Sequence, residues 1–286
     1  MKYLIIVTIV WAFSFSLIGE FLAGRIDSYF AVFVRVALAS LVFLPFTKFR
    51  NIRFDLQISL MAIGAVQIGI MYLFYYNSFL YLSVAEIALF TIFTPFYVTF
   101  VYDICLKRFR ALYLISVGIA VFGAFVIRYN DISSDFVIGF LLVQGANLCF
   151  GVGQSAYKVL IEKHDLKNQS EVFGYFHFGA FFVTLFAFLT FGDFAKISVD
   201  FTQGLILLWL GVVASGIGYF MWNKGGVSVD SGVLAIMNNA LIPVAIIVNL
   251  IIWQKDIEFI KLFLGSIFII LSLIIHVKIM RFYNKQ

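Results

Sequence analysis

The stretch YLFYYNSFLYLSVAEIALFTIFTP (residues 72–95) has a gapless counterpart 148 residues later, FMWNKGGVSVDSGVLAIMNNALIP (residues 220–243). In each stretch, an aromatic-rich helix end leads into a short turn with a serine, and then into an apolar helix that carries one proline, Pro95 or Pro243. Identity between the two stretches is low, so the agreement lies in the order and spacing of these features. It indicates that the chain contains an internal repeat.

The composition around this repeat is that of a membrane protein. Of 286 residues, 63% are hydrophobic and 12% charged, and the mean hydropathy is +1.04. A soluble domain of this size could not hide so much apolar surface, because its shell must face water. Disorder, a disulfide-stapled domain and an outer-membrane barrel are likewise excluded, because the chain has three prolines and two cysteines and runs apolar for about 20 residues at a time.

Ten apolar runs are long enough to cross a bilayer as helices, at about 20 residues each. They leave no room for a soluble domain. The expected spans are residues 3–22, 29–47, 56–77, 82–103, 110–128, 136–157, 172–191, 204–223, 231–252 and 260–280.

The repeat divides these spans into two sets of five, residues 1–130 and residues 131–286. Because five is an odd number, the second set must cross the membrane in the opposite sense to the first. The predicted fold is therefore an all-α integral membrane protein with ten transmembrane helices in two inverted five-helix repeats. Inverted repeats are typical of secondary transporters.

Basic residues predict the orientation of the chain. If the N-terminus is cytoplasmic, most Lys and Arg residues between the spans fall on the cytoplasmic side. We expect a multi-pass protein of the bacterial inner (plasma) membrane with both termini in the cytoplasm. The same bias accounts for the net charge of +5 without any nucleic-acid partner.

Several segments resemble the EamA domains of the drug/metabolite transporter superfamily. They are WAFSFSLIG (residues 11–19), FVRVAL (33–38), the hairpin ending at Pro95 and its copy ending at Pro243. The likeness covers the whole chain as two EamA units, with departures at Ala12 and at the Lys-Arg pair of residues 107–108. It implies transport of a small metabolite such as an amino acid, amine, carboxylate or nucleotide-like compound.

Three charged residues, Glu20, Arg35 and Glu86, fall within the expected spans near one side of the membrane. A charge there needs a partner, a wet cavity or an interface. The three either pair with one another and reach the interface, or form a charged vestibule for an ionic substrate. Arg35 is the leading candidate for substrate contact, because a guanidinium binds a carboxylate through two parallel hydrogen bonds.

One expected span, residues 136–157, together with the residue that follows it, carries a polar stripe about 100° wide at 100° per residue. Such a stripe must face protein or water rather than lipid. It forms either a cavity wall or a set of interhelical hydrogen bonds, and its last residue could also reach the interface. Its members are Gln144, Asn147, Gly151, Gln154, Ser155 and Lys158.

The span 231–252 carries Asn238 and Asn239 shortly before Pro243. Proline removes one backbone donor and frees a carbonyl, which polar side chains can satisfy. The two asparagines therefore either repair a kink at Pro243 or contact substrate, and Pro95 is the corresponding kink or hinge in the first half. The remaining candidates for substrate contact are polar or aromatic residues on other spans, namely Trp11, Gln67, Tyr75, Trp222 and Asn223.

The sequence predicts a secondary transporter of a small polar metabolite that works by alternating access. No Walker motif is present, so the energy is expected from a coupling ion or an exchanged solute. The scattered cysteines and histidines predict no metal site, and no cofactor is indicated. A membrane-embedded enzyme and a channel or non-transporting scaffold are the alternatives, and the oligomeric state is left open.

Overall fold

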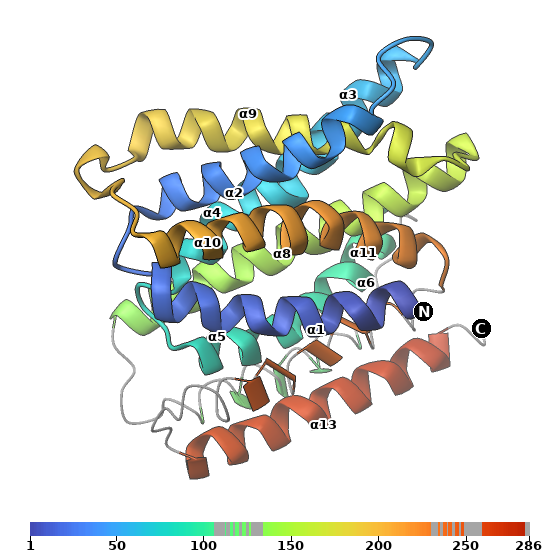
Figure 1. Cartoon of the computed structure of the whole chain (residues 1–286). Helices are drawn as coiled ribbons and strands as arrows, with labels where there is room; N and C mark the ends of the chain where they lie inside the picture. Colours follow the sequence, from blue (N-terminus) through green and yellow to red (C-terminus); the bar gives the residue numbers. More distant parts are fainter. Residues whose placement is uncertain are drawn as a thin grey trace.

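The computed structural model describes residues 1–105, 134–229 and 259–283, together with single residues between 112 and 126 and between 234 and 248. Across these residues the secondary structure is helical, without strands. The helices lie side by side and run between two ends of the molecule (Figure 1). The predicted all-α membrane architecture agrees with this arrangement.

Seven uninterrupted helical runs are long and apolar enough to cross a membrane, and each coincides with a predicted span. The run Val84–Val98 is apolar but shorter. The predicted spans 110–128 and 231–252 lie outside the continuously described residues. The seven runs are Lys2–Leu22, Ser28–Phe46, Phe54–Ser78, Ser134–His164, Gln169–Phe191, Phe201–Val227 and Phe263–Tyr283.

These runs are composed of shorter elements. Those of the first half are α1 (Lys2–Leu17), η1 (Ile18–Leu22), α2 (Ser28–Phe43), η2 (Leu44–Phe46), α3 (Phe54–Gly64), η3 (Ala65–Ile70), α4 (Met71–Ser78), α5 (Val84–Phe90), η4 (Thr91–Phe93) and α6 (Thr94–Cys105). Those of the second half are α8 (Ser134–His164), η5 (Gln169–Glu171), α9 (Phe173–Phe191), η6 (Phe194–Lys196), α10 (Phe201–Trp209), η7 (Leu210–Ile217), α11 (Gly218–Val227) and α13 (Phe259–Tyr283).

Three of the runs change from α-helix to π-helix along their length, at η1, η3 and η7. A π-helical turn shifts the hydrogen bonds of the backbone and often marks a functional site. The first half and the second half each place such a segment within a long span, at Ala65–Ile70 and Leu210–Ile217.

Helix packing links the two halves of the chain. Helix α2 packs against α9 and η7, and α9 in turn packs against α3 and η3. The close approach of α3 and α9 requires Gly64, because a Cβ there would lie only 1.7 Å from the carbonyl oxygen of Phe176. Small residues allow helices in lipid to pack through their backbones.

The predicted span 82–103 is one run broken at a proline. A 3₁₀ turn, η4, separates α5 from α6, which begins one residue before Pro95. Pro95 has no N–H to donate to the carbonyl of Thr91, and the hydroxyl of Thr94 donates to that oxygen instead at 2.7 Å. The side chain thus satisfies the carbonyl that proline leaves free. Asn239 and Pro243 lie outside the described residues.

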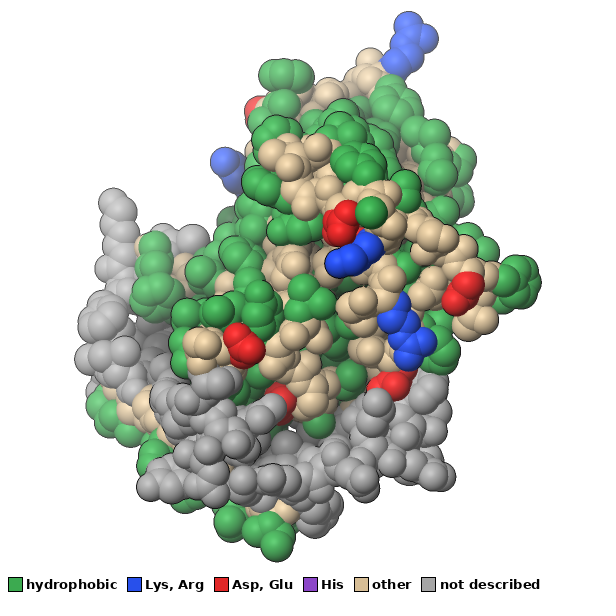
Figure 2. Space-filling view, turned by 90° about the vertical axis from the view of Figure 1, so that its left-hand side faces the viewer, with side chains coloured by type: hydrophobic (Ala, Val, Ile, Leu, Met, Phe, Trp, Pro, Cys, Tyr) green, Lys and Arg blue, Asp and Glu red, His purple; other side chains and the backbone are tan. Residues whose placement is uncertain are grey.

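Backbone hydrogen bonds link the two halves of the chain at both ends of the bundle. At one end, where α1 begins and α13 ends (Figure 1), the connection after α2 meets the one after α8 through a Lys48 N–H to Glu171 O bond of 2.8 Å. At the other end, Asp27 N donates to Lys196 O at 2.9 Å. Figure 2 shows this second end, where acidic and basic side chains lie between hydrophobic flanks.

Candidate substrate-binding site

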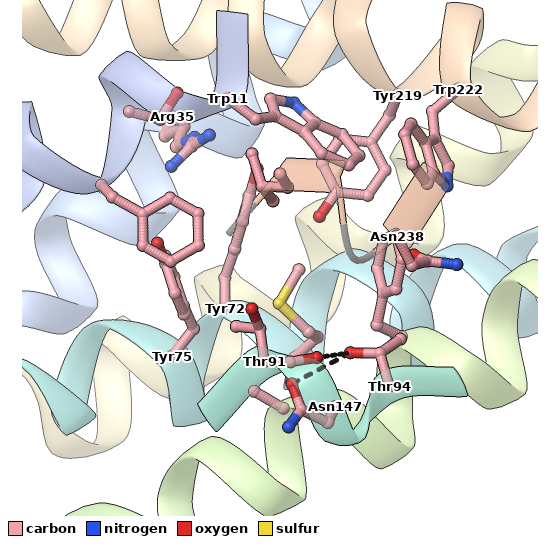
Figure 3. A pocket seen from close by; sticks show the side chains of 16 residues that line it. Trp11, Arg35, Tyr72, Tyr75, Thr91, Thr94, Asn147, Tyr219, Trp222 and Asn238 are labelled. Carbon is pink, nitrogen blue, oxygen red and sulfur yellow. Dashed lines mark hydrogen bonds between the residues drawn. The ribbon is translucent and has the colours of Figure 1, made fainter. Parts of the chain in front are cut away.

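A cavity of about 90 Å³ lies among the helices and draws its walls from both halves of the chain. A cavity of that size has room for several water molecules, at roughly 10–15 Å³ each. The lining is mainly aromatic, with a few polar groups (Figure 3). The lining residues are Trp11, Ser14, Phe15, Arg35, Met71, Tyr72, Tyr75, Thr91, Thr94, Ala146, Asn147, Phe150, Tyr219, Trp222, Asn238 and Leu241.

Arg35 is the charged residue of this lining and is only 2% exposed. Its Nε donates to the Ser215 hydroxyl at 2.5 Å and its Nη1 to the Tyr76 hydroxyl at 3.1 Å. The guanidinium carbon lies 4.3 Å from the centre of the Tyr72 ring, where a cation is attracted to the aromatic face. Neutral groups therefore hold the guanidinium in place.

No ion pair joins Arg35 to any residue that the structure describes. Its hydrogen bonds to described residues use Nε and Nη1, which leaves the Nη2 amino group for another acceptor. A buried charge in a membrane protein is retained where it has a partner or contacts water. The cavity beside Arg35 supplies the space for an anionic partner.

Aromatic rings form the wall on the same side of the cavity as Arg35 (Figure 3). The ring of Trp11 lies 4.8 Å from that of Tyr219 and 4.9 Å from that of Trp222. The indole of Trp11 is fixed in turn, because its Nε1 donates to the carbonyl of Ala214 in η7 at 2.8 Å. The rings offer a preformed apolar surface to a flat ligand.

Polar side chains form the opposite wall (Figure 3). Asn147 on α8 donates to the Phe90 carbonyl at 2.9 Å and accepts from the Thr94 hydroxyl at 3.2 Å. Asn238, another lining residue, donates to Leu234 O at 3.0 Å. The break before Pro95 thus lies at the cavity and is tied to α8.

The polar stripe of α8 is used mainly between helices. Asn147 is its one member among the cavity-lining residues. Gln144 accepts from the Tyr97 hydroxyl at 3.3 Å, Gln154 accepts from Trp222, and Lys158 donates to Gly226 O at 3.4 Å. One residue of the stripe thus lies at the cavity wall, and the others named here form hydrogen bonds between helices.

The two acidic candidates lie apart from the cavity lining. Glu20 lies in η1 and is half-buried. Glu86 accepts from the backbone N–H and the hydroxyl of Ser83, at 2.9 and 2.7 Å, and completes a capping box at the start of α5. Of the predicted charged vestibule, Arg35 is the member that reaches the cavity.

Four predicted residues form two hydrogen-bonded pairs on neighbouring helices, and we call them the amide cluster; they are Gln67, Gln154, Trp222 and Asn223. Gln67 Nε2 donates to Asn223 Oδ1 at 3.1 Å, and Trp222 Nε1 donates to Gln154 Oε1 at 3.0 Å. Trp222 belongs to both the amide cluster and the cavity wall.

Sequence reasoning missed the residues that hold Arg35, namely Tyr72, Tyr76 and Ser215. A serine inside the apolar run 204–223, and three tyrosines within five residues of the repeated stretch, were the available signals. Neither signal indicates a partner at long range. No cluster of three or more His, Cys, Asp or Glu residues that could hold a metal occurs in the described part of the chain.

A multi-pass membrane protein whose helices enclose a cavity with one fixed guanidinium and several aromatic rings has the architecture of a membrane transporter. Residues 1–129 match the EamA-like transporter family. Together with the relatives described next, this match shows that the chain belongs to that family, as the resemblance implied.

Similar proteins of known name cover almost the whole chain. The biotin transporters of Salmonella typhimurium and Escherichia coli K12 are 46% and 47% identical over 279 residues, which is 97% of this chain and 93% of theirs. A probable biotin transporter of Pseudomonas aeruginosa is 46% identical over 274 residues, 96% of each chain. The protein is therefore a transporter of a small metabolite and not an enzyme.

A solved crystal structure of a protein with 14% sequence identity superposes with a TM-score of 0.68. The superposition covers 96% of this chain and 95% of that chain. It shows that the fold is shared.

Proposed function

We propose that this protein is a secondary transporter of biotin, a small carboxylate whose ring system carries a urea group. The observation that carries the proposal is the buried guanidinium of Arg35, which borders the cavity and has neutral partners among the described residues. A substrate carboxylate would supply the missing negative charge. The names of the relatives, biotin transporters at 46–47% identity, point to the same substrate.

The shape and chemistry of the cavity also suit such a ligand. One end offers the Nη2 group of Arg35, which can join Nη1 in a forked pair of hydrogen bonds to a carboxylate. The rings of Trp11, Tyr219 and Trp222 offer an apolar surface for a compact ring system. The cavity of about 90 Å³ is small for biotin, so we expect the walls to move apart when substrate binds.

We further propose that transport proceeds by alternating access between two inverted repeats, residues 1–130 and 131–286. The packing supports this arrangement, because the contacts between the halves are reciprocal. Helix α2 of the first half packs against η7 of the second, and α9 of the second half packs against η3 of the first. The two π-helical segments occupy corresponding places in their spans. Residues of both halves line the cavity, as expected of a site at the interface between repeats.

Charge at the two ends supports a cytoplasmic location of both termini, in the bacterial inner membrane. Described Lys and Arg residues concentrate at the end where α1 begins and α13 ends, whereas the opposite end holds three of them, Arg25, Lys196 and, at the start of α13, Lys261. Basic residues favour the cytoplasmic side. The energy would come from a coupling ion or an exchanged solute, since the sequence has no Walker motif.

Counterflow in proteoliposomes tests the proposal. Vesicles that contain the purified protein and unlabelled biotin should take up external labelled biotin faster than protein-free vesicles. Added biotin methyl ester, which lacks the carboxylate charge, should compete poorly. If labelled biotin enters both kinds of vesicle at the same rate, biotin transport is refuted.

A further inference from the structure

The amide cluster forms the layer of side chains next to the cavity on three helices. Gln67, Gln154 and Asn223 each lie four residues from a cavity-lining residue, namely Met71, Phe150 and Tyr219. Four residues are about one helical turn. Each amide therefore lies about one turn beyond the cavity, in the direction of the end where α1 begins, and Gln67 and Asn223 are hydrogen-bonded to each other there.

The sequence of α8 allows this cluster to form. A Cβ at Gly153 would lie 2.1 Å from the Cβ of Gln67, so only glycine lets α8 approach η3 this closely. Gln154 follows Gly153 directly in the sequence, so its backbone lies close to Gln67. Cluster and cavity are joined by Trp222, which lines the cavity and donates to Gln154.

Each of the three amides has one buried polar atom without a partner. They are Gln67 Oε1, Gln154 Nε2 and Asn223 Nδ2, on side chains that are 0%, 3% and 3% exposed. Buried polar groups in proteins are nearly always satisfied, because an unmade hydrogen bond is costly. The three side chains belong to the two hydrogen-bonded pairs of one layer, Gln67 with Asn223 and Gln154 with Trp222, and their unused polar atoms are the groups that a ligand could satisfy.

The pattern of donors and acceptors is determined by the neighbours. An indole N–H can only donate, so Trp222 fixes the carbonyl oxygen of Gln154 as its acceptor and leaves the amino group as a donor. Gln67 and Asn223 are bonded to each other. Whichever way these two amides are turned, one carbonyl oxygen and one amino group are left over. The cluster thus offers two donors and one acceptor.

We propose that the amide cluster is a subsite for a neutral, planar head group that both accepts and donates hydrogen bonds, and that this group is a cyclic urea. The urea oxygen accepts from the amino groups of Gln154 and Asn223, and a ring N–H donates to the oxygen of Gln67. The assignment rests on the proposed function, because the urea is the head group of biotin.

Other head groups fit the cluster less well. A carboxylate accepts only and would leave the oxygen of Gln67 unpaired. A guanidinium donates only and would face the two amino groups without an acceptor to offer them. Discrimination of this kind is strong when a buried polar group would lose its partner.

The spacing of the two subsites agrees with a ligand that has polar groups at opposite ends. Ser215, which holds Arg35, precedes Asn223 by eight residues of the same helical run, roughly 12 Å at 1.5 Å per residue. In biotin a valerate chain separates the carboxylate from the urea. With the carboxylate at Arg35, the urea is directed along the run towards the amide cluster.

The test compares biotin with 2-iminobiotin, in which a guanidinium replaces the urea at neutral pH. Binding to the purified protein is measured by competition and by thermal shift. The wild type should prefer biotin by at least tenfold, and Gln154→Glu, which exchanges a donor for an acceptor, should reduce this preference at least tenfold. Asn223→Asp should act in the same direction and serves if the first variant fails to fold.

The matched control is Gln57→Glu, the same substitution at a half-buried glutamine of α3 that donates to Ile52 O, outside the cluster and the cavity. It should leave the preference unchanged. A preference that is unchanged in both cluster variants, in a protein that binds biotin, overturns the subsite but not the proposed function. If the cluster holds only water, we expect this same result, an unchanged preference for biotin over 2-iminobiotin in both variants.

A second pair of ligands separates the two proposals. Imidazolidin-2-one and 2-aminoimidazoline are the urea and the guanidinium without the valerate chain. If biotin does not bind to the wild type, the proposed function fails. In that case the subsite stands only if the wild type still prefers imidazolidin-2-one to 2-aminoimidazoline and Gln154→Glu reverses that preference. If no such preference exists, the subsite is overturned as well.

Discussion

Substitution of Arg35 by lysine should reduce the preference of the transporter for a carboxylate over its uncharged amide, although the positive charge is kept. In the wild type, Nε and one N–H of Nη1 are used by Ser215 and Tyr76. The remaining three N–H groups can form two parallel bonds to a carboxylate. A lysine ammonium has three donors in all and cannot form that fork.

The magnitude follows from the number of bonds lost. If the ammonium keeps one bond to the hydroxyl groups and one to the substrate, one charge-assisted hydrogen bond disappears, worth about 1.5–3 kcal/mol. At about 1.4 kcal/mol per factor of ten, this corresponds to a roughly 10- to 100-fold weaker Kd for biotin. Biotinamide, which never had the charged bond, should lose much less.

The assay is competition binding of biotin and biotinamide to the same preparations, so that the ratio of the two Kd values is independent of expression level. Tyr76→Phe is the control, because it removes a hydroxyl partner of Arg35 but leaves the guanidinium. It should change the ratio far less than Arg35→Lys. If Arg35→Lys weakens both ligands equally, Arg35 does not bind the carboxylate, and the reasoning fails.

Three further predictions concern packing, access and topology. Gly153→Ala should lower the melting temperature by several degrees, because the added Cβ would overlap Gln67. Gly204→Ala, where the added Cβ meets open space, should not lower it. Equal melting temperatures of the two variants would contradict the close approach of α8 and η3. In a background without the native cysteines, Asn147→Cys should react with a small polar thiol reagent, and biotin should slow the reaction because Asn147 lines the cavity. Leu141→Cys is the control, because Leu141 is 61% exposed on the outer face, and biotin should not slow its reaction. Reporter enzymes active only in the cytoplasm should be active at both termini, and activity at one terminus alone would refute the proposed orientation.

The sequence by itself determined the class of protein and most of the spans. Runs of about 20 apolar residues form transmembrane helices, because lipid offers no hydrogen-bond partners and a helix satisfies its own backbone N–H and C=O groups. The seven long runs of the structure therefore coincide with predicted spans. The candidate Arg35 also followed from sequence, because a charge inside a span requires an explanation wherever it occurs.

Only the tertiary structure decided which polar residues act together. From the sequence, Glu20, Arg35 and Glu86 could either pair with one another or form one vestibule. In the structure, Glu86 caps its own helix, while Arg35 is held by Ser215, 180 residues away. Local periodicity shows which face of a helix is polar and carries no information about which other helix that face meets. The partners are set by close approaches such as that at Gly153, which depend on how all the helices pack at once.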